Sequence, residues 1–274
     1  MPKTFTPKLS PRLEGIVSMV PKGSKTADIG CDHGYISIAL VQRGIAESSI
    51  ASDIRSGPLA QAEKNVGKAG LEDKIRTRLA PGISGLASGE ADVIIIAGMG
   101  QRTIAEILSD DMEPAKEAKY LILQPQSEIP EMRDFLKENG FTILQNKMIR
   151  EEEKYYFAML VSYGEKDLPN DAVNISAALV ERMEMNAQPE FAETVKALDR
   201  LFGMDLICSE PEMAYYLNFV EREWSEALEK LHKAKKPDFQ KIAEIEAKAS
   251  AAKLALEMNM SFCKTEEKFR DIFE

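Results

Sequence analysis

A short apolar strand that runs through a glycine-containing turn into a helix is the feature that most constrains this chain. Residues 26–35 read Thr-Ala-Asp-Ile-Gly-Cys-Asp-His-Gly-Tyr, so this stretch holds two glycines and two acids. Such a turn brings backbone N–H groups to a helix N-terminus, where the partial positive charge favours anionic or electron-rich ligands. The stretch predicts a ligand site there, with an ordinary glycine-rich turn as the alternative.

Strand and helix patterns alternate around this turn. The periodicity predicts helices from residue 11 to about 20 and at 35–43, 58–68, 101–109 and 128–139, with strands at 26–29, 49–53, 74–79, 91–97 and 120–123. Five strands alternating with helices indicate right-handed crossovers and a doubly wound parallel sheet, whose ligand lies at the carboxyl ends of the strands. Asp53 ends the second strand, where nucleoside-binding folds place a carboxylate to accept hydrogen bonds from ribose.

Two further β-rich runs, 141–150 and 154–163, are separated by only three glutamates. This connection is too short for a parallel crossover and predicts an antiparallel hairpin. A Rossmann dehydrogenase would carry Gly-x-Gly-x-x-Gly and continue with further βα units, so it is the minor alternative. A terminal hairpin after five parallel strands instead resembles the Rossmann-like sheet of class I methyltransferases.

Composition narrows the classes of function. The 274 residues are 44% hydrophobic and 29% charged, as in ordinary soluble globular proteins. The first residues contain no apolar run that predicts a secretory signal or anchor, so we expect a cytoplasmic protein with no membrane partner. Three widely spaced cysteines and two histidines predict neither a disulfide framework nor a metal site.

The charge is unevenly distributed along the chain. Of the total net charge of −10, residues 1–164 carry −2 and residues 165–274 carry −8. Charge alone therefore does not favour nucleic-acid binding, which needs local Lys and Arg. One basic cluster nonetheless lies in the first 27 residues, and another lies between residues 230 and 241.

The composition changes after residue 164, which predicts two domains, 1–164 and 165–274, joined by a linker at 167–170. Two long helical patterns, 213–234 and 238–258, predict a coiled-coil-like helical C-terminal domain. Its turn carries Lys230, Lys233, Lys235 and Lys236. This turn is either an RNA-binding arm or part of a packing or dimerisation module, and we expect a monomer or weak homodimer.

Five sequence segments together resemble one family. Leu9-Ser-Pro-Arg-Leu13, Ala27-Asp-Ile-Gly-Cys-Asp-His-Gly-Tyr35, Gly57-Pro58, Ile96-Ala-Gly-Met-Gly100 and Leu121-Ile-Leu-Gln-Pro125 occur in the order and spacing of the bacterial tRNA (adenine-22, N1)-methyltransferases, the TrmK family. The resemblance covers residues 9 to about 163. It implies transfer of a methyl group from S-adenosylmethionine to N1 of the adenine at position 22 of tRNA.

The resemblance also implies a set of cofactor-binding residues, and the chain departs from the family pattern within it. Ala80-Pro81-Gly82 replaces a Gly-Asp-Gly loop, and Gln101 and Gln126 replace a Gly and an Asn. These departures leave open a divergent cofactor- or RNA-binding paralogue with weak catalysis, or a small-molecule methyltransferase. The expected cofactor residues are Asp28, Gly30, Cys31, Asp32, His33, Gly34, Tyr35, Asp53, Ile54, Ala80, Pro81, Gly82, Ala97, Gly98 and Met99.

Chemistry assigns provisional roles to some of these residues. Asp32 is the candidate catalytic residue, because a carboxylate near the methylated ring would stabilise its positive charge. The competing interpretation is that Asp32 binds the methionine amino group or caps the helix. Cys31 fits a small turn residue better than a nucleophile. The expected substrate and RNA contacts are Arg12, Gln101, Arg102, Gln124, Gln126, Lys230, Lys233, Lys235 and Lys236.

Overall fold

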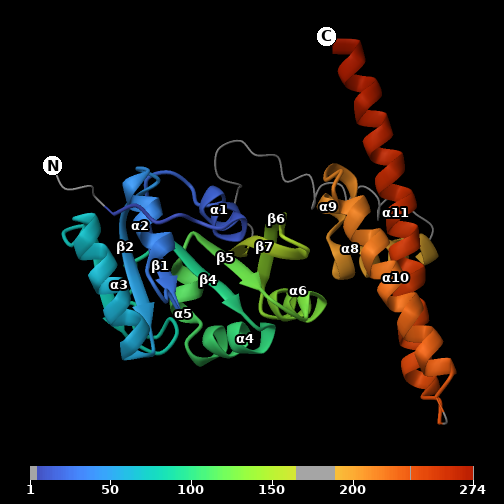
Figure 1. Ribbon diagram of the computed structural model, residues 1–274, viewed down its shortest axis with the longest axis horizontal. Helices are drawn as coiled ribbons and strands as arrows, with labels where there is room; N and C mark the ends of the chain where they lie inside the picture. The colour runs from blue at the N-terminus through green and yellow to red at the C-terminus, as the bar shows by residue number, and fades with distance from the viewer. Residues whose placement is uncertain (1–4, 165–188, 235, 274) are drawn as a thin grey trace. The chain divides into compact units, whose positions relative to one another are not determined.

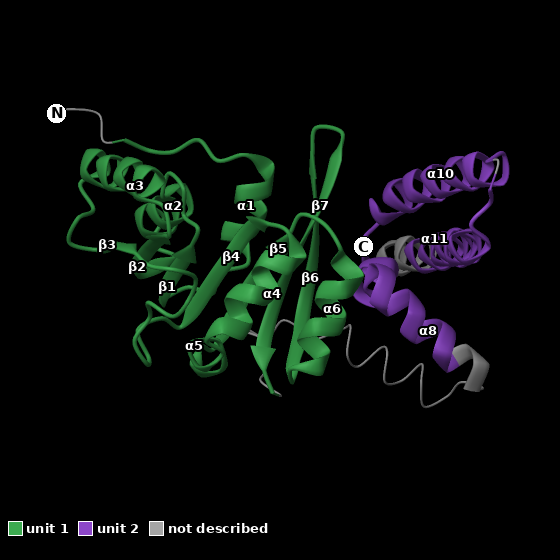
Figure 2. Cartoon of the chain, turned by 90° about the horizontal axis from the view of Figure 1, so that it is seen from below, with its two compact units in different colours: residues 1–174 green, residues 175–274 purple. Residues whose placement is uncertain are grey.

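The computed structural model describes residues 5–164, 189–234 and 236–273. The chain divides into two compact units, residues 1–174 and 175–274, which Figure 2 colours separately. The domain boundary was predicted after residue 164. The linker predicted at 167–170 lies outside the described residues, so both stay predictions.

The first unit contains a seven-stranded sheet in the order β3-β2-β1-β4-β5-β7-β6. Its strands are β1 (Ser24–Ile29), β2 (Ala46–Asp53), β3 (Ile75–Leu79), β4 (Val93–Met99), β5 (Tyr120–Pro125), β6 (Phe141–Glu151) and β7 (Lys154–Tyr163). The first five strands pair in parallel, whereas β7 pairs antiparallel with both β5 and β6. The predicted Rossmann-like sheet with a terminal antiparallel hairpin is therefore confirmed.

Helices cover both faces of this sheet (Figure 1). On one face lie α1 (Pro11–Ser18), α2 (Tyr35–Gln42) and α3 (Ser56–Ala69), and on the other lie α4 (Gln101–Asp110), α5 (Glu113–Glu117) and α6 (Ile129–Glu138). The central strand β4 contributes Ile95 to the first core and Ile94 and Ile96 to the second, all fully buried. Burial on both faces explains why β4 is continuously apolar in sequence.

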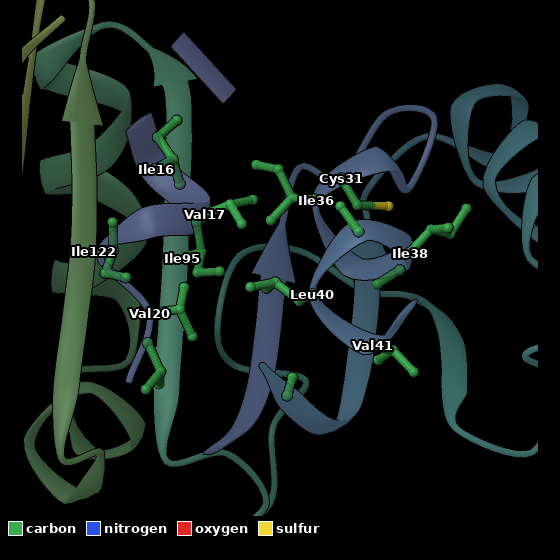
Figure 3. Packing of buried hydrophobic residues seen from close by; sticks show 14 of the residues in the cluster. Ile16, Val17, Val20, Cys31, Ile36, Ile38, Leu40, Val41, Ile95 and Ile122 are labelled. Carbon is green, nitrogen blue, oxygen red and sulfur yellow. The ribbon is translucent and has the colours of Figure 1, made fainter. Parts of the chain in front are cut away.

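The first core fixes helix α1 over the middle of the sheet. Ile16 and Val17 of α1 lie near Ile95 of β4 and Ile122 of β5 in Figure 3. Helix α1 begins where the sequence predicts, because the Ser10 hydroxyl accepts a hydrogen bond from the Leu13 amide at 3.5 Å. This packing holds the start of α1 beside the carboxyl ends of the strands.

Several element boundaries differ from the prediction. Strand β2 begins three residues early, at Ala46, because it pairs with Ser24 of β1. Strand β5 continues two residues beyond Leu123, to Pro125, because its last residues pair with the end of β4. Helix α5 was not predicted, since five residues are too few to show a helical period.

The second unit is helical in its described part. It contains α8 (Pro189–Phe202), α9 (Met204–Ser209), α10 (Met213–His232) and α11 (Phe239–Phe273). Helices α10 and α11 pack together as the predicted pair, burying Leu217 and Val220 of α10 and Ile242 and Ala252 of α11. Helix α11 extends fifteen residues past its predicted end. Among the described residues, no helix is both long and apolar enough to cross a membrane.

Candidate active site

A cleft of about 580 Å³ lies at the carboxyl ends of the parallel strands in the first unit. This volume falls in the range of about 300–1,000 Å³ that is typical of small-molecule sites. The loops after β1, β2 and β3 and the end of β4 form its walls, because parallel strands end at one edge of the sheet. The predicted cofactor residues that line the cleft are Asp28, Gly30, Cys31, Asp32, His33, Tyr35, Asp53, Ile54, Ala80, Pro81, Gly82, Ala97, Gly98 and Met99.

The turn after β1 is held against β2 by its own backbone. The amides of Gly30 and Cys31 both donate to the Ser52 carbonyl, at 2.8 and 2.9 Å. Gly30 has a φ of +72°, and a Cβ there would overlap the methyl group of Met99 at the end of β4. Glycine is favoured at position 30 by this positive φ, which other residues rarely adopt, whereas the Met99 methyl group is the end of a flexible side chain that can move aside.

Gly34 is the one predicted cofactor residue that does not line the cleft. It is the N-cap of α2 with a φ of +70°, and a Cβ there would lie 3.2 Å from the Cβ of Ala62 in α3. The structure therefore gives Gly34 a role in packing α2 against α3, while its neighbours face the cleft.

Asp53 ends β2 with its carboxylate almost fully buried at the edge of the cleft. Its Oδ1 accepts from the Arg55 amide at 2.8 Å, and its Oδ2 accepts from the Asp32 amide at 3.4 Å. Arg55 Nε also donates to Oδ1 at 3.4 Å, so Arg55 occupies both lone pairs of this oxygen. These bonds fix the carboxylate in place and leave a further lone pair on Oδ2. This geometry fits the predicted acceptor for ribose hydroxyls.

Asp28 lies on the cleft floor at the end of a buried chain of hydroxyl groups. The Ser37 hydroxyl donates to Asp28 Oδ2 at 3.4 Å, the Ser49 hydroxyl donates to Ser37 at 2.9 Å, and the Thr26 hydroxyl donates to Ser49 at 2.9 Å. Burial raises the pKa of Asp28 to about 7, and the nearby Asp53 contributes to this increase. The site therefore contains a carboxyl group that ionises near neutral pH.

Asp32 and His33 form the open side of the turn. Asp32 has a φ of +48°, in the left-handed region that favours glycine and that few other residues adopt. Its side chain is 58% exposed, and its Oδ2 lies 3.5 Å from His33 Nε2. The His33 ring stacks on Tyr35 with 5.2 Å between ring centroids. The Asp32 carboxylate is thus accessible to a ligand, as both of its predicted roles require.

Cys31 lines the cleft but its thiol is not activated. Burial raises the pKa of the thiol, and the carboxylates of Asp28, Asp53 and Asp32 raise it further. A thiol held in this protonated form is a poor nucleophile. The geometry agrees with the interpretation of Cys31 as a small turn residue.

A hydrogen-bond network joins α1 to the ends of β4 and β5. Gln124 Oε1 accepts from Arg12 Nη1 at 2.9 Å and from the Gly98 amide at 3.2 Å, and Gln124 Nε2 donates to the Pro125 carbonyl at 2.9 Å. Gln124 is fully buried and does not line the cleft. The prediction that Gln124 contacts substrate is not supported by this geometry, because both polar atoms of its amide are used inside the protein.

Arg12 itself reaches the cleft from the start of α1. Its guanidinium carbon lies 5.6 Å from the centre of the Tyr156 ring, and its amide donates to Glu151 Oε2 at 2.8 Å. Hydrogen bonds from the Ser10 side chain and the Arg12 amide lower the pKa of Glu151. The hairpin of β6 and β7 therefore helps to hold Arg12 over the cleft.

The other predicted substrate residues in this unit divide into two groups. Gln126 is exposed and lines the cleft. Gln101 and Arg102, at the start of α4, are not among the residues that line it. Arg102 is 82% exposed and lies 3.5 Å from Glu128 Oε1. Of these three residues, only Gln126 lines the cleft.

Several cleft residues were not predicted from the sequence. The loop after β3 packs on α4, where Gly82 would place a Cβ 3.1 Å from Ile107. This contact turns one face of α4 toward the cleft. A helical period identifies the buried face of α4 but not the part of its exposed face that meets another loop. The cleft residues that were missed are Leu13, Ile29, Ile36, Arg55, Ile83, Ser84, Thr103, Glu106, Ile107 and Asp110.

The predicted lysines belong to the second unit. Lys230, Lys233 and Lys236 are exposed, and Lys233 Nζ lies 3.1 Å from Glu229 Oε2. Lys235 lies outside the described residues. Across the described parts of the chain, His, Cys, Asp and Glu side chains nowhere gather in groups of three or more that could hold a metal ion.

The fold and the cleft define a class of protein. The sheet order, the inserted antiparallel strand and the glycine turn beside a carboxylate are those of a class I methyltransferase, and a methyltransferase-domain family matches residues 9–159. The chain is 34% identical to the tRNA (adenine(22)-N(1))-methyltransferase of Bacillus subtilis over 173 residues, which are 63% of this chain and 73% of that protein. The chain belongs to this family, the TrmK family of bacterial tRNA methyltransferases.

Solved structures share its fold over nearly their full length. The Bacillus subtilis M1A22 tRNA methyltransferase TrmK is 25% identical, with a TM-score of 0.74 over 91% of this chain and 99% of that one. A Streptococcus pneumoniae tRNA (m1A22) methyltransferase bound to S-adenosyl-L-methionine is 29% identical, with a TM-score of 0.64 over 91% and 100% of the two chains. Both similarities extend beyond the methyltransferase domain.

Proposed function

We propose that this protein transfers a methyl group from S-adenosylmethionine to N1 of an adenine in tRNA, at position 22. The observation that carries the proposal is the cleft at the carboxyl ends of the strands, with Asp53 buried at its edge, in a member of the TrmK family. The expected partner is tRNA, and the expected location is the cytoplasm. The protein is expected to act as a monomer or weak homodimer.

The cleft residues fit the proposed cofactor. Asp53 offers a lone pair to ribose hydroxyls, and the 66% exposed Ile54 offers an apolar surface to the adenine ring. When the cofactor is bound, the carboxylate of Asp32, and that of Asp28 in its ionised form, would attract the positively charged sulfonium and amino groups. The cofactor, when bound, supplies an electrophilic methyl group.

The loop after β3 departs from the family pattern but still lines the cleft. Pro81 has no side-chain acceptor for the amino group of the cofactor adenine, so backbone groups of Ala80 and Gly82, which line the cleft, would frame the base instead. Arg78 of β3 holds this region in place through bonds of 2.6 Å to Glu90 and to the Gly85 carbonyl. The hydrogen bond from Arg78 lowers the pKa of Glu90 to about 2.

The reaction needs alignment more than proton transfer. Adenine N1 carries an in-plane lone pair, so no base has to remove a proton before attack. The chain therefore contributes chiefly by fixing donor and acceptor in line, which removes the entropy of their encounter in advance. The exposed Asp32 carboxylate either stabilises the positive charge of the methylated ring or binds the methionine amino group.

A transfer assay tests the proposal. Purified protein is incubated with methyl-labelled S-adenosylmethionine and unmodified bulk tRNA, and the labelled nucleotide is mapped by the reverse-transcription stop that N1-methyladenine causes. We expect label at position 22 only in tRNAs with adenine there. The variant Asp53→Ala should lose cofactor binding and transfer together.

Two results would reject the proposal. Tight cofactor binding without transfer to any tRNA would identify a binding paralogue, as the departures at Pro81 and Gln101 allow. Transfer to small molecules of a cell extract but not to tRNA would identify a small-molecule methyltransferase.

A further inference from the structure

Two amide side chains follow each other closely at the end of β5, and the structure separates their roles. Gln124 lies inside the strand, is fully buried and uses its amide to hold Arg12 and Gly98. Gln126 lies just beyond the strand, is exposed and lines the cleft. Only the second amide is positioned to meet a ligand.

The backbone of Gln126 is fixed while its side chain is free. Its amide N–H donates to the Met99 carbonyl at 2.9 Å, which ties the loop after β5 to the end of β4. The side-chain Nε2 lies 3.8 Å from the point where a side chain on Gly98 would begin. Within the described residues, the Gln126 side chain makes no hydrogen bond, so both its donor and its acceptor are available.

The chemistry of the proposed reaction limits how the target base is held. Adenine N1 is the attacking atom, so its lone pair must point at the methyl group and cannot accept a hydrogen bond from the protein. The groups left for recognition on the adjoining edge are the N6 amino group, a donor, and N7, an acceptor. A Gln or Asn amide matches this pair, since its oxygen accepts from N6 and its nitrogen donates to N7.

Resting on the proposed function, we propose that the Gln126 amide recognises the target adenine through N6 and N7 and thereby leaves N1 open. Among the side chains that line the cleft in the described residues, Gln126 carries the only amide. Arg12 has donors alone and cannot accept from N6. Guanine presents two acceptors, O6 and N7, on this edge, so the same amide disfavours guanine.

The test combines a protein variant with an altered base. Wild-type protein and Gln126→Ala are each assayed on tRNA carrying adenosine or 7-deazaadenosine at position 22. The deaza base lacks N7. It also changes the reactivity of N1, but this change affects both proteins equally and therefore cancels when their adenosine-to-7-deazaadenosine ratios are compared. We expect kcat/KM of the wild type on adenosine to exceed that of Gln126→Ala by about 5- to 150-fold, the range for a bidentate amide–adenine pair.

The deciding result is the ratio of kcat/KM between adenosine and 7-deazaadenosine. This ratio should be about 10-fold larger for the wild type than for Gln126→Ala, because the variant has no amide with which to sense N7. Gln126→Asn, which keeps the amide, should restore part of the dependence on N7. Equal ratios for the wild type and Gln126→Ala would overturn the inference.

Two controls keep this outcome separate from failure of the proposed function. Affinity for S-adenosylhomocysteine should be unchanged in Gln126→Ala, which shows that the cleft is intact. Gln145→Ala removes an exposed amide from β6, outside the cleft, and should behave as wild type. If the wild type itself transfers no methyl group to adenine 22, the proposed function fails, and the inference fails with it.

Discussion

The Asp32 side chain stands on a backbone conformation that glycine usually supplies. Asparagine tolerates this conformation nearly as well as aspartate, so Asp32→Asn removes the charge with little strain. We expect kcat to fall by about 10²-fold, because the positive charge that develops in the transition state is no longer stabilised by a carboxylate. Steady-state kinetics on tRNA measures kcat, and calorimetric titration with S-adenosylhomocysteine measures affinity for the cofactor.

The variant Asp32→Gly is the matched control, since it removes the carboxylate and relieves the positive φ. Both variants should unfold at temperatures close to that of the wild type. A large loss of cofactor affinity with an unchanged kcat would assign Asp32 to the methionine amino group instead. An unchanged rate and affinity would remove Asp32 from the site chemistry.

Asp28 makes the stability of the first unit depend on pH. Burial raises its pKa from an ordinary 3.8 to about 7, so the folded protein holds this proton more tightly than the unfolded chain. Raising the pH from about 4 to about 7 therefore lowers the free energy of unfolding, because Asp28 must lose this proton. Asp28→Asn cannot ionise, so it does not undergo this loss. The unfolding free energy of Asp28→Asn minus that of the wild type should therefore be larger at pH 8 than at pH 4, by on the order of 3 kcal/mol.

Denaturant unfolding of the cofactor-free protein, followed by circular dichroism at several pH values, checks this prediction. The comparison of variant with wild type cancels the titration of other groups. Asp53 lies near Asp28 and contributes to the raised pKa, so Asp53→Asn should reduce the effect without removing it. Parallel pH profiles for wild type and Asp28→Asn would contradict the raised pKa.

The two glutamines after Leu123 show what the sequence allows to be predicted at single residues. Both were expected at the site, because they follow a parallel strand and such strands end at the ligand edge. Pairing with β4 extends β5 to Pro125, which buries Gln124 and leaves Gln126 outside the strand. The extent of pairing depends on the neighbouring strand, so the local sequence cannot separate the two roles.

At the scale of elements, backbone carbonyls at the end of the short helix α9 accept hydrogen bonds from a residue far along the chain. Asn259 of α11 is buried, and its Nδ2 donates to the carbonyls of Ile207 at 2.8 Å and Glu210 at 3.0 Å. Asn259→Ala leaves these carbonyls without that partner and should destabilise the second unit by about 1–3 kcal/mol. Cofactor affinity, a property of the first unit, should not change.

The single tryptophan provides the measurement. Trp224 lies on α10 with its ring 6.2 Å from that of Phe202, so its fluorescence during denaturant unfolding reports on the second unit. Asn218→Ala is a matched control, because Asn218 is exposed and its Nδ2 donates within its own helix to Ala214. The control should be destabilised by less than about 0.5 kcal/mol. Equal destabilisation of the two variants would contradict the role of Asn259.

Sequence reasoning at this scale succeeds where one element determines its own pattern. The parallel strands, the terminal hairpin and the pair α10 and α11 are long and periodic enough to be recognised. The cleft face of α4 is different, because it is set by the contact between Gly82 and Ile107, two residues distant in sequence. For the same reason, the local sequence did not identify Glu106 and Asp110 as cleft residues.

Across the whole molecule, charge is the property that most sharply distinguishes the two parts of the chain. Residues 165–274 carry −8 of the net charge of −10, yet Lys230, Lys233 and Lys236 are exposed near the end of α10. An acidic surface repels tRNA, so a local basic cluster is the part of this unit that favours binding to phosphates. If these helices serve only packing or dimerisation, the cluster should not contribute to the salt dependence of tRNA binding.

Replacing Lys230, Lys233 and Lys236 together by glutamine separates these interpretations. We expect weaker tRNA binding and a shallower dependence of log affinity on log salt, by about 0.7–0.9 for each phosphate that the variant no longer neutralises. Replacing three exposed lysines of the first unit, Lys64, Lys68 and Lys74, is the charge-matched control. Fluorescence anisotropy with labelled tRNA at several salt concentrations measures both slopes. If the slope of log affinity against log salt is the same for both variants, the lysines of the helical unit have no special role in tRNA binding. If the variant in the helical unit changes its oligomeric state but keeps the wild-type slope, the cluster serves self-association.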